Sequence, residues 1–259
     1  MHKYNKFALS VVIALLFTIS LPALANTDIA KRILPAIMFL LLESDEEDMS
    51  TLNDTGITFG GDFPLGNNSG CTGDTIAQQD CSHGRDATNN HGSDGHAGFS
   101  FTKLDINGND LAASASQWSC VRDNVTGLIW EKKIDDGSEQ DKDNTYEWGG
   151  LTALGRDHPN RQGTYFDDWN SLVNHANNIN LCGFNDWRVP EREELRSIVN
   201  YGTFNPSIDV NYFPNTVGNF YWSSSPLANN SGGAWVVNFF NGSGNAFFRS
   251  SSSRVRLVR

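Results

Sequence analysis

The chain has 259 residues, a formal net charge of -11 at pH 7 and four cysteines. An acidic chain is a poor candidate for nucleic-acid binding, because duplex binding depends on Lys and Arg neutralising phosphates. We therefore expect no nucleic-acid partner, while the acidity itself favours solubility and indicates no particular fold.

The first 25 residues have the pattern of a signal peptide. Lys3 and Lys6 form a short basic region, Ala8 to Leu21 is apolar, and Ala23 to Ala25 is a small-residue cleavage site. We predict an exported protein, for which periplasm, outer surface and extracellular medium fit equally. The alternative is a membrane helix that stays uncleaved.

Residues 26–70 are predicted to be a tether or linker. The apolar stretch Ile33 to Leu42 is followed by an acidic run, Glu43 to Asp48. Ten apolar residues are too few to span a bilayer as a helix. Two interpretations stay open: residues 33–42 attach to a membrane surface or mediate self-association, or they pack on the domain or form an extended tether.

Residues 71–117 are polar and rich in glycine and asparagine, which predicts a small subdomain held by a disulfide loop. An even number of cysteines in an exported chain indicates disulfides. Cys71 and Cys81 would close a small loop, and Cys120 and Cys182 would form the second bridge, although four cysteines allow three pairings. The alternation in Phe99 to Leu104 predicts one strand.

The segment Asp105 to Asp110 resembles half of a calcium-binding loop, since it offers side-chain oxygens at alternating positions. It departs from the EF-hand pattern, because glycine falls at the fourth place and Ser116 stands where a bidentate Glu belongs. We favour a tight Asx turn and expect no cofactor, with calcium as the alternative. The histidines lack the spacing of a transition-metal site, so no metal ligands are assigned.

Residues 118–259 have the clearest periodicity. Val125 to Lys132 is predicted as a strand. Asp167 to Ile179 is predicted as a helix, whose buried stripe would be Trp169, Leu172, Val173, Ala176 and Ile179. A second helix is expected with Pro190 in its first turn, acidic residues at its N-terminus, and Leu195, Ile198 and Val199 buried.

After Pro206 the pattern is that of short strands separated by Gly, Asn and Ser turns. The expected strands are Phe220 to Ser224, Ala234 to Phe240, Ala246 to Arg249 and Arg254 to Val258, with a hairpin at Asn241-Gly242. The order predicts an α+β fold with two helices and a small antiparallel sheet, whose final strand pairs beside Val125 to Lys132.

Four ordered motifs carry a family resemblance. They are Gly183 to Leu195, Thr126 to Glu131, Tyr221 to Ser224 and Val255 to Arg259. Together they resemble the C-terminal domain family of the Legionella collagen-like adhesin, a domain of unknown function, from Trp118 to Arg259. The resemblance implies a C-type-lectin-like fold and favours the Cys120–Cys182 bridge. The sugar-coordinating triplets of calcium-dependent lectins are absent.

The residues that we expect to be structural belong to these motifs or to the following strand. Asp186 and Arg188 would pair or bind loop carbonyls around a core tryptophan. The full set is Trp130, Asp186, Trp187, Arg188, Trp222 and Trp235. Arg254 and Arg256 share one face of the last strand, where we expect them to pair with carboxylates, with contact to acidic glycans as the alternative.

The last forty residues are predicted to form the ligand-binding surface. Their mixture of aromatic residues with Ser, Gly and Asn is typical of a paratope. It also resembles the variable-protein branch of C-type-lectin-like domains, which diversity-generating retroelements rewrite. The candidate binding residues are Asn229, Asn230, Ser231, Phe240, Ser243, Asn245, Phe247, Phe248, Ser250 and Ser252.

We conclude from the sequence that the chain is an exported, non-enzymatic recognition or adhesion module whose partner is a glycan or a surface protein. One alternative is a structural or assembly subunit of the cell envelope that uses residues 33–42. An enzyme similar to the sulfatase-modifying family is disfavoured, because the cysteines are better explained as bridges. No catalytic residues are assigned, since the chain has no Gly-x-Ser-x-Gly elbow.

Overall fold

The computed structural model describes residues 53–62, 66–69, 78–85, 87, 92–149 and 169–259, which all belong to one unit, Ser50–Arg259. The predicted signal peptide, the apolar segment Ile33 to Leu42 and Cys71 lie outside these residues. Among the described helices, none has the length and hydropathy that a membrane crossing requires.

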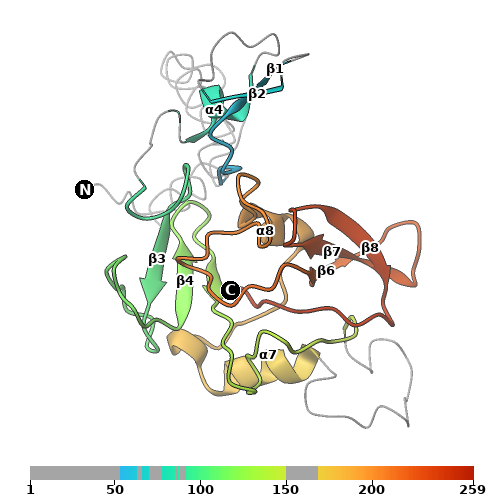
Figure 1. Cartoon of the computed structure of the whole chain (residues 1–259). Helices are drawn as coiled ribbons and strands as arrows, with labels where there is room; N and C mark the ends of the chain where they lie inside the picture. The colour runs from blue at the N-terminus through green and yellow to red at the C-terminus, as the bar shows by residue number, and fades with distance from the viewer. Residues whose placement is uncertain (1–52, 63–65, 70–77, 86, 88–91, 150–168) are drawn as a thin grey trace, which may run out of the picture. The chain divides into compact units, whose positions relative to one another are not determined.

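The fold is α+β, with short helices and small antiparallel sheets (Figure 1). The linker-like region contains a hairpin of two short strands, β1 (Gly60–Asp62) and β2 (Gly66–Asn68). A four-residue helix, α4 (Asp80–His83), follows. The Gln79 side chain joins them, since it donates a hydrogen bond to the carbonyl of Gly61 and accepts one from its amide.

The second sheet is antiparallel and has the order β3-β4-β5, with strands β3 (Phe101–Leu104), β4 (Cys120–Asp123) and β5 (Ile129–Glu131). This sheet contains strands from both sides of the domain boundary that the sequence suggested between residues 117 and 118. The strand predicted from Val125 begins only at Ile129, because Asp123 accepts hydrogen bonds from the amides of Val125 and Thr126 and thereby forms a turn. Strand β4 was not among the predicted strands.

The third sheet contains β6 (Phe220–Pro226), β7 (Gly233–Asn238) and β8 (Gly244–Phe248), again antiparallel. The hairpin expected at Asn241-Gly242 is present, but four residues connect the paired Asn238 and Ser243. The connection is longer than the tightest Asn-Gly turn because Phe239 is drawn into the core, where its ring packs edge-on against Tyr221 at 5.0 Å.

The two predicted helices are α7 (Trp169–Asn178) and α8 (Arg192–Ser197), with a short 3-10 turn, η2 (Leu181–Gly183), between them. Ile179 was expected in the buried stripe of α7, but it is 48% exposed. The prediction was wrong for Ile179, which lies just past the last residue of α7 and before the left-handed Asn180 that turns the chain away from the helix. The expected cap at Asp167 or Asp168 lies outside the described residues.

Helix α8 begins at Arg192, two residues after Pro190, which the sequence placed in its first turn. Pro190 precedes the helix, and Glu191 is the N-cap residue. Glu191 and Glu194 form a reciprocal capping box, which satisfies backbone amides that would otherwise lack partners at the helix start. Leu195, Ile198 and Val199 are buried, as the sequence predicts.

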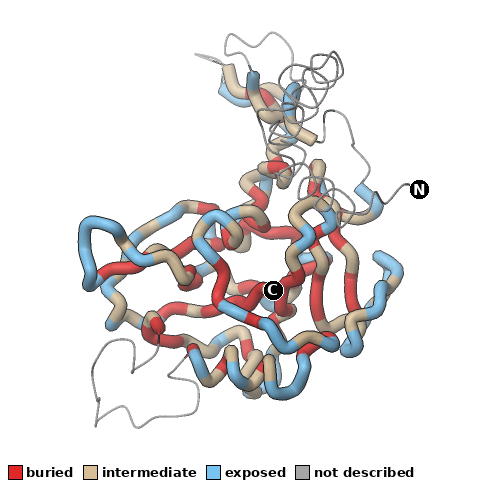
Figure 2. Tube along the Cα trace, turned by 180° about the vertical axis from the view of Figure 1, so that it is seen from behind, coloured by how far each residue is buried: buried red, intermediate tan, exposed pale blue. Residues whose placement is uncertain are grey.

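The C-terminal segment connects the sheets. Val258 forms antiparallel bridges with both Trp130 and Arg188, and Arg254 forms a parallel bridge with Tyr221. The expected pairing beside β5 is therefore present, although as bridges and not as a regular strand. Figure 2 shows the C-terminal end of the trace surrounded by buried residues.

Hydrophobic core clusters pack against both faces of β6 and β7 in the third sheet. Trp222 and Val236 belong to a cluster that includes α7 and the Cys120–Cys182 pair, whereas Tyr221 and Val237 belong to a second cluster that includes Leu195 of α8. Successive strand residues point to opposite faces, which explains the alternation. Core residues therefore contact both faces of β6 and part of β7, while Phe248 of β8 stays exposed.

Candidate functional site

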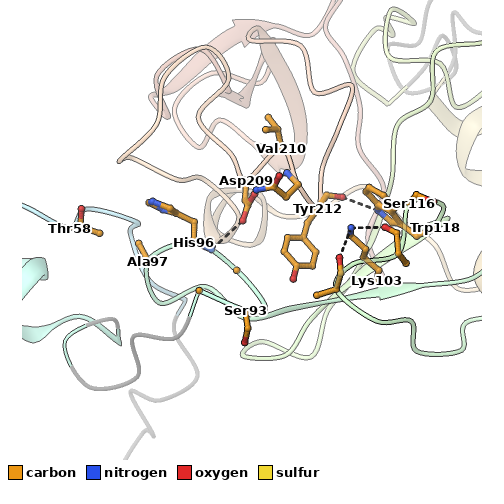
Figure 3. A pocket seen from close by; sticks show the side chains of 15 residues that line it. Thr58, Ser93, His96, Ala97, Lys103, Ser116, Trp118, Asp209, Val210 and Tyr212 are labelled. Carbon is orange, nitrogen blue, oxygen red and sulfur yellow. Dashed lines mark hydrogen bonds between the residues drawn. The ribbon is translucent and has the colours of Figure 1, made fainter.

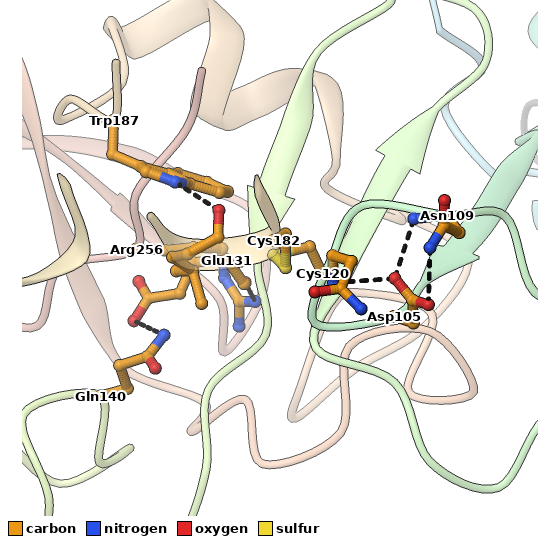
Figure 4. Close-up of a disulfide and its surroundings, with 10 residues drawn as sticks. Asp105, Asn109, Cys120, Glu131, Gln140, Cys182, Trp187 and Arg256 are labelled. Carbon is orange, nitrogen blue, oxygen red and sulfur yellow. Dashed lines mark hydrogen bonds between the residues drawn. A yellow bond between two sulfur atoms is a disulfide. The ribbon is translucent and has the colours of Figure 1, made fainter. Parts of the chain in front are cut away.

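A disulfide fixes the frame beneath the candidate surface. Cys120 of β4 and Cys182 of η2 are bonded, with their Cα atoms 6.4 Å apart, so this predicted bridge is confirmed (Figure 4). Both cysteines are buried. Cys81 is also in a disulfide, and its expected partner, Cys71, lies outside the described residues.

Trp187 occupies the centre of this frame. Its buried indole donates a hydrogen bond to the carbonyl of Leu181 at 3.0 Å. The side-chain amide of Asn177 accepts a hydrogen bond from the Trp187 amide at 2.7 Å and donates one to the Trp187 carbonyl at 3.0 Å. Helix α7 and the segment before α8 are therefore held together around one tryptophan.

The charged neighbours of Trp187 have other partners than the sequence suggested. Asp186 does not pair with Arg188: its carboxylate accepts two hydrogen bonds from Arg259, at 2.6 and 3.0 Å. Arg188 instead donates two to Glu194, at 2.7 and 2.6 Å. These hydrogen bonds hold the pKa values of the Asp186 and Glu194 carboxyls below their usual range.

The outward face of the β7–β8 hairpin and its flanking loops, which we call the hairpin surface, contains a cavity of about 380 Å³. Gly233 and Phe248 are cross-strand partners on this face, as are Trp235 and Ala246. Phe248 is 69% exposed. The cavity is lined by Leu227, Asn230, Gly233, Ala246, Phe247, Phe248 and Ser251.

The walls of this cavity are held by backbone hydrogen bonds. Leu227 donates to Gly233, Gly233 donates to Asn230, and Ser251 donates to Phe248, at 3.1, 3.0 and 2.8 Å. A loop closed in this way needs little ordering when a partner binds, which lowers the entropic cost of association.

The structure separates the predicted binding residues into two groups. Asn229, Asn230, Ser231, Phe247, Phe248, Ser250 and Ser252 lie in or beside the cavity, at the Gly233 end of β7. Phe240, Ser243 and Asn245 lie at the turn end, where Phe240 packs edge-on against Phe204 and Asn245 bonds to Ser243. Because each strand residue advances the chain by about 3.3 Å, the ends of β7 are roughly 17 Å apart.

Phe247 differs from the exposed residues of the first group. Its ring packs 4.5 Å from that of Phe220 and 6.3 Å from that of Trp222, so it supports the core as well as the cavity. Phe248, on the opposite face of the same strand, has no such contact among the described aromatic rings. Only Phe248 is therefore a clean probe of binding.

Leu227 and Ser251 also line the cavity, together with Gly233 and Ala246, which the sequence did not single out individually. Trp235, which was expected to belong mainly to the scaffold, is half-buried: its ring centroid lies 4.5 Å from the Arg192 guanidinium, and the residue lines a neighbouring cavity of about 240 Å³. The cross-strand partnership of Trp235 with Ala246 would have revealed this placement, since partners share a face.

Arg254 and Arg256, the two arginines considered for contact with acidic glycans, both donate hydrogen bonds within the chain. Arg256 is buried and donates hydrogen bonds to the Glu131 carbonyl and the Thr216 hydroxyl, each at 2.7 Å. Arg254 donates to the carbonyl of Lys142 and lies 3.5 Å from the Asp143 carboxylate. Of the two expected carboxylate pairs, only that of Arg254 is present among the described residues.

The Asp105 loop has the geometry of an Asx turn. The Asp105 carboxylate accepts hydrogen bonds from the amides of Asn107 and Asn109 and from the Asn109 side chain, at 2.8 to 3.0 Å (Figure 4). Asp110 accepts two from Arg122, each at 2.7 Å. Another acidic group, Asp135, Asp141 and Asp143, surrounds Lys142, which pairs with the first and the last.

Comparison with known families identifies the C-terminal part of the chain. Residues 119–259 match the family model described as the Lcl C-terminal domain. No curated protein matches the chain.

Proposed function

This chain belongs to the Lcl C-terminal domain family, and we propose that it is an exported, non-enzymatic recognition module that binds a glycan or a surface protein through the hairpin surface. Family membership and the Cys120–Cys182 disulfide support a surface or extracellular adhesion-type module. To this description of an adhesion-type module, the proposal adds the location of the binding surface and a non-enzymatic role.

One observation carries the proposal: an exposed aromatic side chain stands beside a preformed cavity. Phe248 is 69% exposed next to a cavity of about 380 Å³ whose walls are held by backbone hydrogen bonds. Large exposed apolar side chains grouped at a cavity typically mark interaction sites. The neighbouring amide of Asn230 and hydroxyl of Ser251 supply polar groups that orient a ligand.

The chemistry of the lining favours binding over catalysis. No carboxylate, histidine, lysine or cysteine of the described chain lines this cavity. Acid–base catalysis needs a titratable group within hydrogen-bonding reach of the substrate. The return of the C-terminal segment to β5 supports our inference that residues 119–259 have a C-type-lectin-like arrangement.

The proposal is tested by glycan-array and whole-cell binding of residues 26–259 with the disulfides intact. Phe248→Ala should reduce binding at least tenfold, whereas Ile106→Ala, a 58% exposed residue of the Asp105 loop, is the matched control. Parallel measurements with calcium and with chelator determine whether an ion participates.

Two results would contradict the proposal. One is equal binding by wild type and Phe248→Ala, which would place the site elsewhere. The other is the absence of binding to any glycan or cell, which would favour the assembly alternative that uses residues 33–42. Light scattering with and without residues 26–60 then measures assembly directly.

A further inference from the structure

A second and larger cavity, of about 740 Å³, lies outside the hairpin surface. Its walls come from residues 92–97, from the stretch between Lys103 and Trp118, and from residues 209–212 (Figure 3). We call it the Lys103 cleft. Most of its lining precedes residue 119, where the family match begins, so the family assigns no role to it.

Lys103 is the central charged group of this cleft. It is only 6% exposed, and its ammonium donates hydrogen bonds to the carbonyls of Ala113 and Ala115, at 2.8 and 2.9 Å. It also lies 3.9 Å from the centroid of the Trp118 ring. An ammonium has three donors, so one N–H remains after these two bonds.

The positive charge of Lys103 is poorly balanced. Within the described residues it forms no ion pair, and burial lowers its pKa, which Asp209 partly offsets. Lys132 lies 4.8 Å from the same Trp118 ring and also has no ion pair in the described part of the chain; burial, and then Lys103, lower its pKa. Two lysines share one indole in a chain with a net charge of -11.

Tyr212 supplies a second donor to the cleft. The residue is only 4% exposed, and its hydroxyl has no hydrogen-bond partner among the described side chains and backbone groups. Burial, with Asp209 and Asp94, raises its pKa to about 12, so the hydroxyl stays protonated. Figure 3 shows its ring between His96 and Lys103 in the cleft, and the ring centroid lies 5.5 Å from the Lys103 ammonium.

The Tyr212 hydroxyl and the remaining N–H of Lys103 belong to side chains that line the cleft, and neither has a hydrogen-bond partner in the described chain. Both donors are therefore available to an anionic oxygen group that enters the cleft. The one remaining N–H of Lys103 and the O–H of Tyr212 match the two oxygens of a carboxylate. The carboxylates of Asp209 and Asp94 disfavour a doubly charged anion such as phosphate.

We propose that the Lys103 cleft binds a carboxylate group, with Lys103 and Tyr212 as its hydrogen-bond donors and the Trp118 and Tyr212 rings as its apolar wall. This site is independent of the proposed function, because no residue of the hairpin surface lines it.

Acetate is the probe that tests the proposal. It is titrated into the ¹⁵N-labelled chain at constant ionic strength, with chloride as the balancing anion. The signal is the Trp118 indole N–H, which donates to the Tyr212 carbonyl at 3.0 Å and is assigned with Trp118→Phe. We expect a saturable shift, which Lys103→Met abolishes and Tyr212→Phe weakens about tenfold, as loss of one charge-assisted hydrogen bond implies.

Lys142→Gln is the matched control. Lys142 already pairs with Asp135 and Asp143, so its loss should leave the acetate affinity unchanged. Methyl sulfate, which has the same charge, serves as a second probe and should bind more weakly than acetate.

Three outcomes would overturn the proposal. A shift that does not saturate, or that is equal in wild type and Lys103→Met, would indicate general ionic screening. Tighter binding of methyl sulfate would exclude a carboxylate site. If Lys103→Met does not fold, Tyr212→Phe decides, because removing a hydroxyl that has no partner leaves the packing intact, and an unchanged acetate affinity in that variant would contradict the assignment.

Discussion

The carboxylate of Asp186 and the guanidinium of Arg259 form two hydrogen bonds across 73 residues of sequence. The same guanidinium lies 3.9 Å from the centroid of the Phe184 ring. This pair joins the turn before α8 to the C-terminal segment, whose residue Val258 bridges both Trp130 and Arg188. The frame beneath the hairpin surface therefore depends on contacts that span most of the family domain.

Asp186→Asn should lower the free energy of unfolding by about 0.5 kcal/mol, because the pair is largely exposed and solvent screens it. Urea denaturation of Asp186→Asn, Arg259→Gln and the double variant measures the coupling between them. A coupling energy of zero would show that the pair does not contribute to stability.

Acid should destabilise the fold through Asp186 and Glu194. Hydrogen bonds from Arg259 and Arg188 lower the pKa values of these carboxyls, so their contribution is present above the pKa of an unfolded carboxyl and is lost as the pH falls through the lowered folded pKa. The loss should begin below about pH 4. Urea titrations as a function of pH should show a smaller loss in Asp186→Asn/Glu194→Gln than in wild type, and equal slopes would contradict this account.

Removing the Cys120–Cys182 disulfide should cost about 2–5 kcal/mol, because the bond closes a long loop and restricts the unfolded chain. The variant Cys120→Ala/Cys182→Ala, compared with wild type by urea denaturation without reductant, gives the difference. Since the bridge lies in the cluster that supports the third sheet, we also expect weaker binding at the hairpin surface. Unchanged stability would mean that hydrophobic packing alone holds β4 against η2.

Lys133→Met should be more damaging than a surface substitution. Lys133 and Glu131 form a fully buried ion pair at 3.0 Å, and Glu131 also accepts a hydrogen bond from the Leu257 amide at 2.9 Å. Leaving the carboxylate buried without its cation costs about 3–5 kcal/mol. Adding Glu131→Gln removes that charge and should restore part of the stability, which thermal and urea unfolding of both variants can measure. A double variant that is less stable than Lys133→Met would be inconsistent with this explanation.

Alanine substitutions at Phe247 and Phe248 should distinguish effects on stability from effects on binding. Phe248→Ala should change the free energy of unfolding by less than about 0.5 kcal/mol, because the side chain is 69% exposed. Phe247→Ala should cost about 3 kcal/mol, because its ring packs against Phe220 and Trp222. Similar losses of stability in the two variants would show that Phe248 is part of the core and invalidate its use as a binding probe.

The sequence by itself determined the features that depend on short-range pattern. The apolar period of Trp169, Leu172 and Ala176, the acidic start of α8 and the Asn241-Gly242 hairpin all arise from residues a few positions apart. Each local interaction places the next residue on a known face of a helix or strand. The family motifs and the Cys120–Cys182 bridge, which the resemblance favoured, were also correct.

Only the tertiary structure decided which distant groups meet. Asp186 pairs with Arg259 and not with Arg188. Arg256 is buried and donates a hydrogen bond to the Thr216 hydroxyl, and Phe239 packs in the core, which lengthens the hairpin loop. The candidate binding residues likewise lie at two ends of the hairpin. Lys103 and Tyr212 are close in space although they are far apart in sequence. Such pairings depend on which distant segments of the chain pack together. Many arrangements satisfy the local sequence patterns equally well, and packing and desolvation favour one of them.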